Sequence, residues 1–104
     1  RLEGSAVRVP TASVSAVDLV VMTERPATVE AVNAAFRAAG GVIGATDQAL
    51  VSTDLRARAE SIVMACPETR VTKGGMLRVF GWYDNEWGFS NRMLDVALLM
   101  GAKP

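Results

Sequence analysis

The residues best suited to chemistry lie in one stretch near the C-terminus, residues 82–91, which reads Trp-Tyr-Asp-Asn-Glu-Trp-Gly-Phe-Ser-Asn. It holds both tryptophans and the single tyrosine of the chain, with acidic and amide side chains between the rings. A core strand would not carry these polar groups, because buried carboxylates and amides need hydrogen-bonding partners. Aromatic surface with a few fixed polar groups is typical of a binding-site wall. A strand end, a turn and a helix start that happen to be aromatic explain the stretch equally well.

Two polar side chains are candidates for binding a ligand. Arg8 lies among valines in a short apolar segment, and a guanidinium group matches the geometry of phosphate oxygens. The alternative is an arginine whose aliphatic stem covers apolar surface. Asn85 offers both a donor and an acceptor to a ligand, or it is a turn residue that bonds its own backbone.

Three segments of the chain carry a resemblance to a known family. They are residues 82–95, where the aromatic stretch continues as Arg-Met-Leu-Asp, residues 7–19, which begin Val-Arg-Val-Pro-Thr, and residues 50–54, Leu-Val-Ser-Thr-Asp. In their order along the chain, 7–19, 50–54 and 82–95, they resemble the last third of the phosphorylating glyceraldehyde-3-phosphate dehydrogenases and of their relatives, the erythrose-4-phosphate dehydrogenases. Three ordered segments are a stronger indication than any single short motif.

The resemblance implies a role for each candidate residue. Arg8 matches the family arginine that contacts inorganic phosphate or the substrate phosphate, and Asn85 matches the residue that holds the carboxamide of the nicotinamide ring of NAD. Tyr83 and Glu86 would brace the nicotinamide pocket, although Glu86 could instead pair with an arginine. Phe89 stands where many members have tyrosine, and it would pack beside the cofactor. Arg8 and Asn85 are therefore expected to reach one shared cavity.

Cys66 is not expected to be catalytic. The family uses a cysteine nucleophile activated by histidine, but Cys66 lies outside that motif and the chain has no histidine. A structural cysteine is the better interpretation, and a zinc site of the usual ligands is excluded. The resemblance places the nucleophile, its base and the dinucleotide-binding fold upstream, so the chain alone would oxidise nothing.

Composition sets broad limits on partners and location. Half of the 104 residues are hydrophobic, and eleven Lys and Arg balance eleven Asp and Glu. A core can therefore form, while the basic stripe of a nucleic-acid binder is missing. The apolar runs are shorter than a membrane span, and no signal peptide is visible. One cysteine favours a cytoplasmic setting. The first residue is Arg1, so we expect a piece of a longer protein, namely residues 1–104 as a partial catalytic domain.

Residue patterns predict the elements of an α+β fold, an antiparallel or mixed sheet with helices packed on one face and no Rossmann half. Alternation, glycine pairs and apolar residues at helical spacing are the signals. They predict strands at 5–9, 14–22, 49–54 and 62–65, a hairpin of 69–72 and 76–83, a helix from a cap at Thr28 to Gly40, and a last helix capped by Ser90 or Asn91. The last helix is apolar almost all round, so it is either buried or packed against a partner.

Two departures from the family pattern leave an alternative open. The loop around residues 40–44 is shorter than usual, and we interpret its glycines as a cap and turn. The usual Asn-Gly-Asp-Pro turn is replaced by Arg-Ala-Arg-Ala-Glu at residues 56–60, which has helical propensity. In the family this turn lies near subunit contacts. The chain is thus part of an enzyme acting on glyceraldehyde 3-phosphate or erythrose 4-phosphate, or a binding module that kept the sheet and lost the chemistry. In either case a complementary portion or a second copy is expected as partner.

Overall fold

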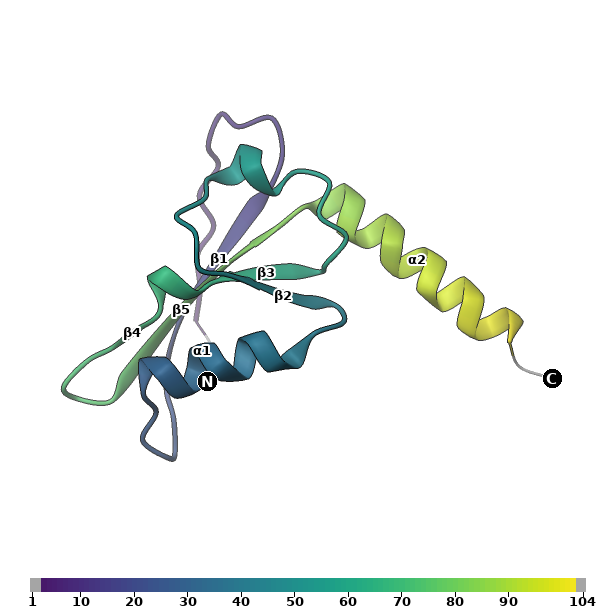
Figure 1. Cartoon of the computed structure of the whole chain (residues 1–104). Coiled ribbons are helices and arrows are strands. Elements are labelled where there is room, and N and C mark those ends of the chain that lie inside the picture. The colour runs from purple at the N-terminus through teal and green to yellow at the C-terminus, as the bar shows by residue number, and fades with distance from the viewer. Residues whose placement is uncertain (1–2, 103–104) are drawn as a thin grey trace.

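The computed structural model describes residues 3–102 and shows an α+β fold, which confirms the predicted class (Figure 1). Residues 1–2, including Arg1, and residues 103–104 of the predicted domain lie outside the described residues. Two short 3-10 helices accompany the regular elements. In chain order the elements are β1 (Ser15–Met22), α1 (Val29–Ala39), β2 (Ile43–Thr46), η1 (Ser52–Leu55), β3 (Ile62–Ala65), η2 (Cys66–Glu68), β4 (Arg70–Val71), β5 (Met76–Tyr83) and α2 (Asn85–Gly101).

The sheet is mixed and is organised around β5. The strand order is β1-β5-β3-β2, and the short β4 also pairs with β5. β5 is antiparallel to β1 along eight residue pairs, from Ser15↔Tyr83 to Met22↔Met76, whereas β2 and β3 are parallel. The predicted hairpin is confirmed as β4 and β5, and Gly75 adopts the positive φ of 82° that its turn requires. The prediction that β5 is a central strand is also confirmed.

Helix α1 packs on the sheet face that carries Leu77 and Val79. Val32 and Phe36 of α1 pack against these two buried residues and Met64. The partners recur at helical spacing on α1 and at alternate positions on β5, as the two periodicities require. This layer of side chains forms the larger of the two hydrophobic clusters.

The boundaries of α1 lie where the sequence predicts them. Thr28 has an extended backbone, and its hydroxyl accepts a hydrogen bond from the backbone N–H of Ala31 at 3.2 Å. Glu30 in the first turn favours the positive end of the helix dipole. Gly40 ends the helix with a φ of 59°, a conformation that glycine adopts without steric cost.

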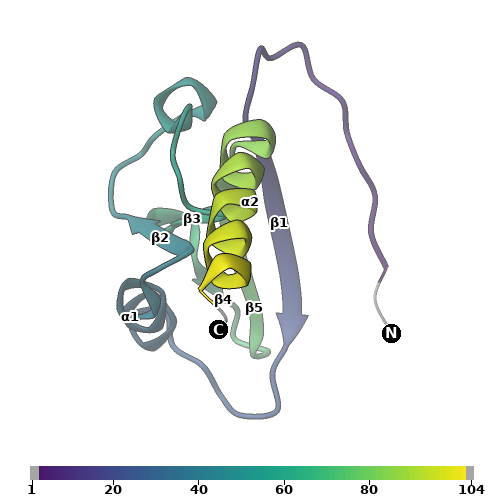
Figure 2. The same ribbon diagram turned by 90° about the vertical axis from the view of Figure 1, so that its right-hand side faces the viewer.

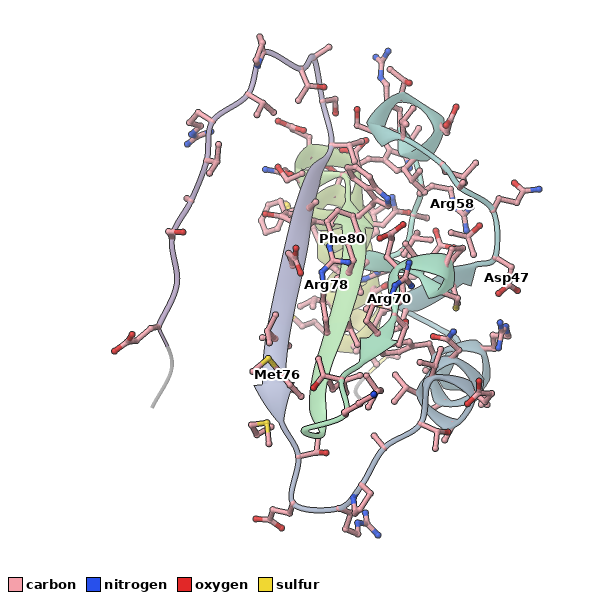
Figure 3. All side chains as sticks on the ribbon, turned by 90° about the vertical axis from the view of Figure 1, so that its left-hand side faces the viewer. Asp47, Arg58, Arg70, Met76, Arg78 and Phe80 are labelled. Carbon is pink, nitrogen blue, oxygen red and sulfur yellow. The ribbon has the colours of Figure 1, made fainter. Side chains whose placement is uncertain are left out.

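The opposite sheet face bears charge at its centre. Arg78 of β5 forms ion pairs with Asp18 of the neighbouring strand, at 2.8 Å, and with Glu68, at 3.3 Å. Figure 3 shows Met76, Arg78 and Phe80 following one another along β5 on this face. Asp18 is the one polar residue among Ala16, Asp18 and Val20 on its face of β1, and the guanidinium of Arg78 lowers its pKa.

A second, smaller hydrophobic core lies on this face, near the C-terminal end of β5. Val14, Leu55 and Val63 are buried together, and Leu50 and Trp82 pack against them. Val14 has a positive φ of 71°, which is a strained conformation for a β-branched residue.

Two segments in the first half of the chain differ from the sequence-based prediction, although β1 and α1 match it. Residues 5–9 are extended but are not part of the sheet, and Val7 and Val9 are 83% and 63% exposed. Figure 2 shows this N-terminal segment running outside β1. Conversely, the glycines of residues 40–44 are predicted to form a cap and turn, but Ile43 and Gly44 belong to β2, because residues 43–46 pair in parallel with β3. A four-residue strand containing glycine has too few positions to show alternation.

The connection between β2 and β3 also differs from expectation. Residues 49–54 are not a strand, because the carboxylate of Asp54 accepts the N–H of Val51 at 2.9 Å and the chain turns into η1. Residues 56–60 form no helix despite their propensity. Ala57 there has a positive φ of 60°, which no right-handed helix contains.

Helix α2 begins at Asn85 with Asp84 as its cap, six or seven residues before the predicted cap at Ser90 or Asn91, and it extends away from the sheet (Figure 1). The large apolar side chains of its distal turns are more than half exposed, namely Met93, Leu94, Val96, Leu98, Leu99 and Met100. Within residues 3–102 the helix is therefore not buried, which leaves packing against a partner as the remaining alternative. In the described part of the chain, neither helix has the length and apolar character that crossing a membrane requires.

Candidate cofactor-binding site at the start of helix α2

The junction between β5 and α2 is built around the carboxylate of Asp84. One oxygen accepts the N–H of Trp87 at 3.0 Å and caps the helix, and the other accepts the N–H of Ala57 at 3.0 Å. The side chain is buried, at 8% exposure. These N–H donors, that of Trp87 first, lower the pKa of the carboxyl group. Because Asp84 satisfies the first helical N–H groups, the helix starts at Asn85 and the aromatic stretch becomes its first turns.

Two further residues of α2 contact the same neighbouring segment, residues 57–61. A Cβ atom at Gly88 would lie 3.1 Å from the carbonyl oxygen of Glu60, so the helix approaches this backbone closely. One turn later, the guanidinium of Arg92 donates to the carbonyl of Ala59 and to the hydroxyl of Ser61, both at 3.2 Å. Residues four apart share one helix face. We call Asp84, Gly88 and Arg92 the docking stripe.

A cavity of about 320 Å³ brings together three of the predicted site residues, Tyr83, Asn85 and Phe89. Tyr83 is half-buried, whereas the amide of Asn85 is exposed and the ring of Phe89 is 65% exposed. Ser61 and the docking stripe complete the wall. An amide beside two aromatic rings is the composition that binds a flat ring bearing a polar substituent.

Two predicted residues do not line this cavity. Glu86 faces a separate cavity of about 470 Å³, whose wall also includes Trp87, Arg56 and Thr53. Arg8 lies in the exposed N-terminal segment and lines neither of these two cavities. The expectation that Arg8 and Asn85 share a cavity is therefore not met among the described residues.

Sequence reasoning missed the docking stripe. Asp84 was available as a helix cap, since aspartate before a helical run is a strong start signal. The spacing of residues 84, 88 and 92 also indicates one helix face, but nothing in the sequence says which segment this face meets.

Cys66 is buried, and burial raises the pKa of its thiol. Its backbone carbonyl accepts a hydrogen bond from the amide of Asn33 at 3.1 Å, and the hydroxyl of Thr69 donates to the same amide at 2.7 Å. Cys66 lines neither cavity, so it belongs to a structural network between α1 and η2. Among residues 3–102, no cluster of three or more His, Cys, Asp or Glu could hold a metal ion.

Comparison with known proteins gives the family of the chain. Residues 1–85 match the model of the family described as glyceraldehyde 3-phosphate dehydrogenase, C-terminal domain. The chain is 50% identical over 106 residues to the glyceraldehyde-3-phosphate dehydrogenase of Cereibacter sphaeroides, covering 97% of this chain and 32% of that protein. It is 47% identical over 108 residues to glyceraldehyde-3-phosphate dehydrogenase 1 of Bacillus cereus, covering 99% of this chain and 32% of the relative. With glyceraldehyde-3-phosphate dehydrogenase 2 of Staphylococcus aureus strain Mu50 it shares 48% over 104 residues, which is 98% of this chain and 30% of that protein.

The fold and these matches define the chain as a C-terminal domain of the oxidoreductase class. More specifically, it belongs to the glyceraldehyde-3-phosphate dehydrogenase family, which confirms the resemblance inferred from the three sequence segments. It spans about a third of the length of the curated relatives it matches.

Proposed function

We propose that the chain is the C-terminal part of the catalytic domain of an NAD-dependent, phosphorylating glyceraldehyde-3-phosphate dehydrogenase. The observation that carries the proposal is the grouping of Tyr83, Asn85 and Phe89 around one cavity, in a chain about half identical to enzymes of that name. The reaction would oxidise glyceraldehyde 3-phosphate to 1,3-bisphosphoglycerate in the cytoplasm. We prefer this substrate to erythrose 4-phosphate because the relatives described above carry the glyceraldehyde name.

The residues of the cavity fit the nicotinamide end of NAD. The exposed amide of Asn85 can donate to and accept from a carboxamide, and the rings of Tyr83 and Phe89 offer apolar surface to a flat ring. Bound NAD would accept the hydride, and this chain would orient the ring that receives it. Glu86, on the other side of the helix start, would brace the helix instead of touching the ring.

Arg8 would bind phosphate. Its side chain is exposed on the N-terminal segment, so its donors are available to an anion. Since Arg8 lines neither described cavity, its proposed site is separate from both.

The nucleophile, its base and most of the NAD site would come from an N-terminal portion. Two observations support such a partner. The relatives are about three times as long as the chain, and the distal turns of α2 expose a row of large apolar residues. Apolar patches of this kind mark interaction sites. The exposed side chains of β1, such as Val20 and Met22, likewise favour a homo-oligomer.

The test uses the full-length enzyme and two ligands, NAD and ADP-ribose, which lacks the nicotinamide ring. Asn85→Ala is expected to raise the Kd of NAD about tenfold, equivalent to about 1.4 kcal/mol, and to leave the Kd of ADP-ribose unchanged. Equal Kd values for NAD in Asn85→Ala and wild type would remove Asn85 from the site.

A second measurement concerns Arg8. Arg8→Ala is expected to raise the KM for inorganic phosphate or for the sugar phosphate, and Arg25→Ala, on the exposed turn after β1, serves as the matched control. Unchanged phosphate dependence in Arg8→Ala would exclude Arg8. The chain by itself is expected not to bind NAD detectably in a titration, because the dinucleotide-binding fold would be supplied by the other portion.

A further inference from the structure

We propose that the docking stripe, Asp84, Gly88 and Arg92, is a positioning device that sets Asn85 at the nicotinamide by fixing the start of α2 on residues 57–61. The inference rests on the proposed role of Asn85 and extends it to three residues that line the same cavity and also contact residues 57–61.

The stripe accounts for how α2 is held within the described structure. The large apolar side chains beyond Arg92 are more than half exposed, so the contacts of α2 with the described chain lie in its first turns. There, contacts at 84, 88 and 92 meet the backbone of residues 57–61 at three successive heights along one helix face. Three contacts in line fix both the rotation and the axial position of the helix.

Asn85 is the residue most directly governed by this arrangement. It is the first residue of α2 and follows Asp84, whose two oxygens are both engaged by backbone N–H groups from separate segments. A carboxylate accepts both bonds, whereas an amide of the same shape has one acceptor oxygen and would direct its own N–H₂ at the other N–H. Asp84→Asn therefore releases one of the two segments while keeping the side-chain volume.

Gly88 determines how closely α2 can approach the backbone of residues 57–61. A methyl group at this position would be 3.1 Å from the carbonyl oxygen of Glu60, which is backbone and cannot rotate aside. The helix must therefore move by a few tenths of an ångström in Gly88→Ala. Displacement of a reacting group by about 1 Å can cost roughly a hundredfold in rate, so a smaller shift of Asn85 is expected to be measurable.

The experiment compares wild type, Asp84→Asn, Gly88→Ala and Asn85→Ala in the full-length enzyme. The Kd of NAD and the Kd of ADP-ribose are measured by titration calorimetry, together with kcat. We expect each stripe variant to raise the Kd of NAD by about three- to tenfold and to lower kcat, below the roughly hundredfold effect of a 1 Å displacement. The Kd of ADP-ribose is expected to stay within about twofold of wild type, because that ligand lacks the nicotinamide ring that Asn85 would contact.

The control is Thr28→Ala, which removes the cap of α1 and should not change the ratio of the two Kd values. If Asn85→Ala weakens NAD selectively and the stripe variants do not, the positioning role is refuted while the proposed function stands. Equal weakening of NAD and ADP-ribose by the stripe variants also refutes it, since that is a general loss of structure. No selective effect in Asn85→Ala overturns the proposed function itself. If Gly88→Ala fails to fold, the positioning role is tested with Asp84→Asn and Arg92→Lys, which nearly preserve the side-chain volume.

Discussion

Ala57 has a backbone φ of 60°, and its N–H donates to the buried carboxylate of Asp84. We predict that Ala57→Gly stabilises the protein, because glycine adopts this left-handed conformation without the clash that a Cβ atom causes. The hydrogen bond to Asp84 uses only the backbone, so the substitution leaves it in place.

The expected magnitude follows from two opposing effects. The left-handed conformation costs a non-glycine residue about 1–2 kcal/mol. Glycine also gives the unfolded chain more freedom, which costs about 0.4–1 kcal/mol. The net gain in the free energy of unfolding for Ala57→Gly therefore lies between about 0 and 1.6 kcal/mol, centred on about 0.8 kcal/mol.

Ala59→Gly is the matched control in the same exposed turn, and its φ is not positive. There only the entropic effect acts, so Ala59→Gly is expected to lower the free energy of unfolding by about 0.4–1 kcal/mol. The difference between the two variants, measured by urea denaturation with tryptophan fluorescence, isolates the backbone strain and should be about 1–2 kcal/mol. If both glycine variants destabilise the protein equally, the strain at Ala57 is absent and the argument fails.

Three further predictions concern buried polar groups. Asn33→Ala should lower the free energy of unfolding by about 1–3 kcal/mol, because it leaves the Cys66 carbonyl and the Thr69 hydroxyl without their partner; Thr69→Ser, which keeps the hydroxyl, should cost less in the same urea denaturation. The lowered pKa of Asp84 means that its carboxylate stabilises the fold above pH 3.8, its usual value, and that this contribution is lost as the pH falls through the folded pKa; the stability difference between wild type and Asp84→Asn should therefore shrink on acidification, and a constant difference would contradict this. The raised pKa of buried Cys66 predicts slow reaction with a thiol reagent at neutral pH and fast reaction after denaturation, and rapid labelling of the native protein would argue against burial.

The sequence predicted the elements whose pattern is long and local. β5 and its hairpin alternate over eight residues, and α1 combines a threonine cap, helical spacing and a terminal glycine. β2 could not be found in this way, because its four residues become a strand only by pairing with β3 far along the chain. Residues 5–9 show the opposite failure, since alternation predicts a strand but supplies no neighbour for it.

The candidate site stays a prediction, and the structure bears only on where its predicted residues lie. Tyr83, Asn85 and Phe89 do line one cavity, since Tyr83 ends β5 and the other two lie in the first turns of α2. Glu86 lies on another side because successive helical residues are about 100° apart. The position of Arg8 depends on the path of an extended segment, which local patterns do not determine.

β1 is the last strand on its side of the sheet, and within residues 3–102 it pairs only with β5. Its eight residues include Val17, Leu19 and Val20, all more than a third exposed. A long outer strand with unpaired backbone groups and apolar side chains is a template on which further chains can add. Residues 1–104 produced in isolation are therefore expected to form cross-β fibrils, and a proline introduced at Val20 should suppress them by removing a backbone donor.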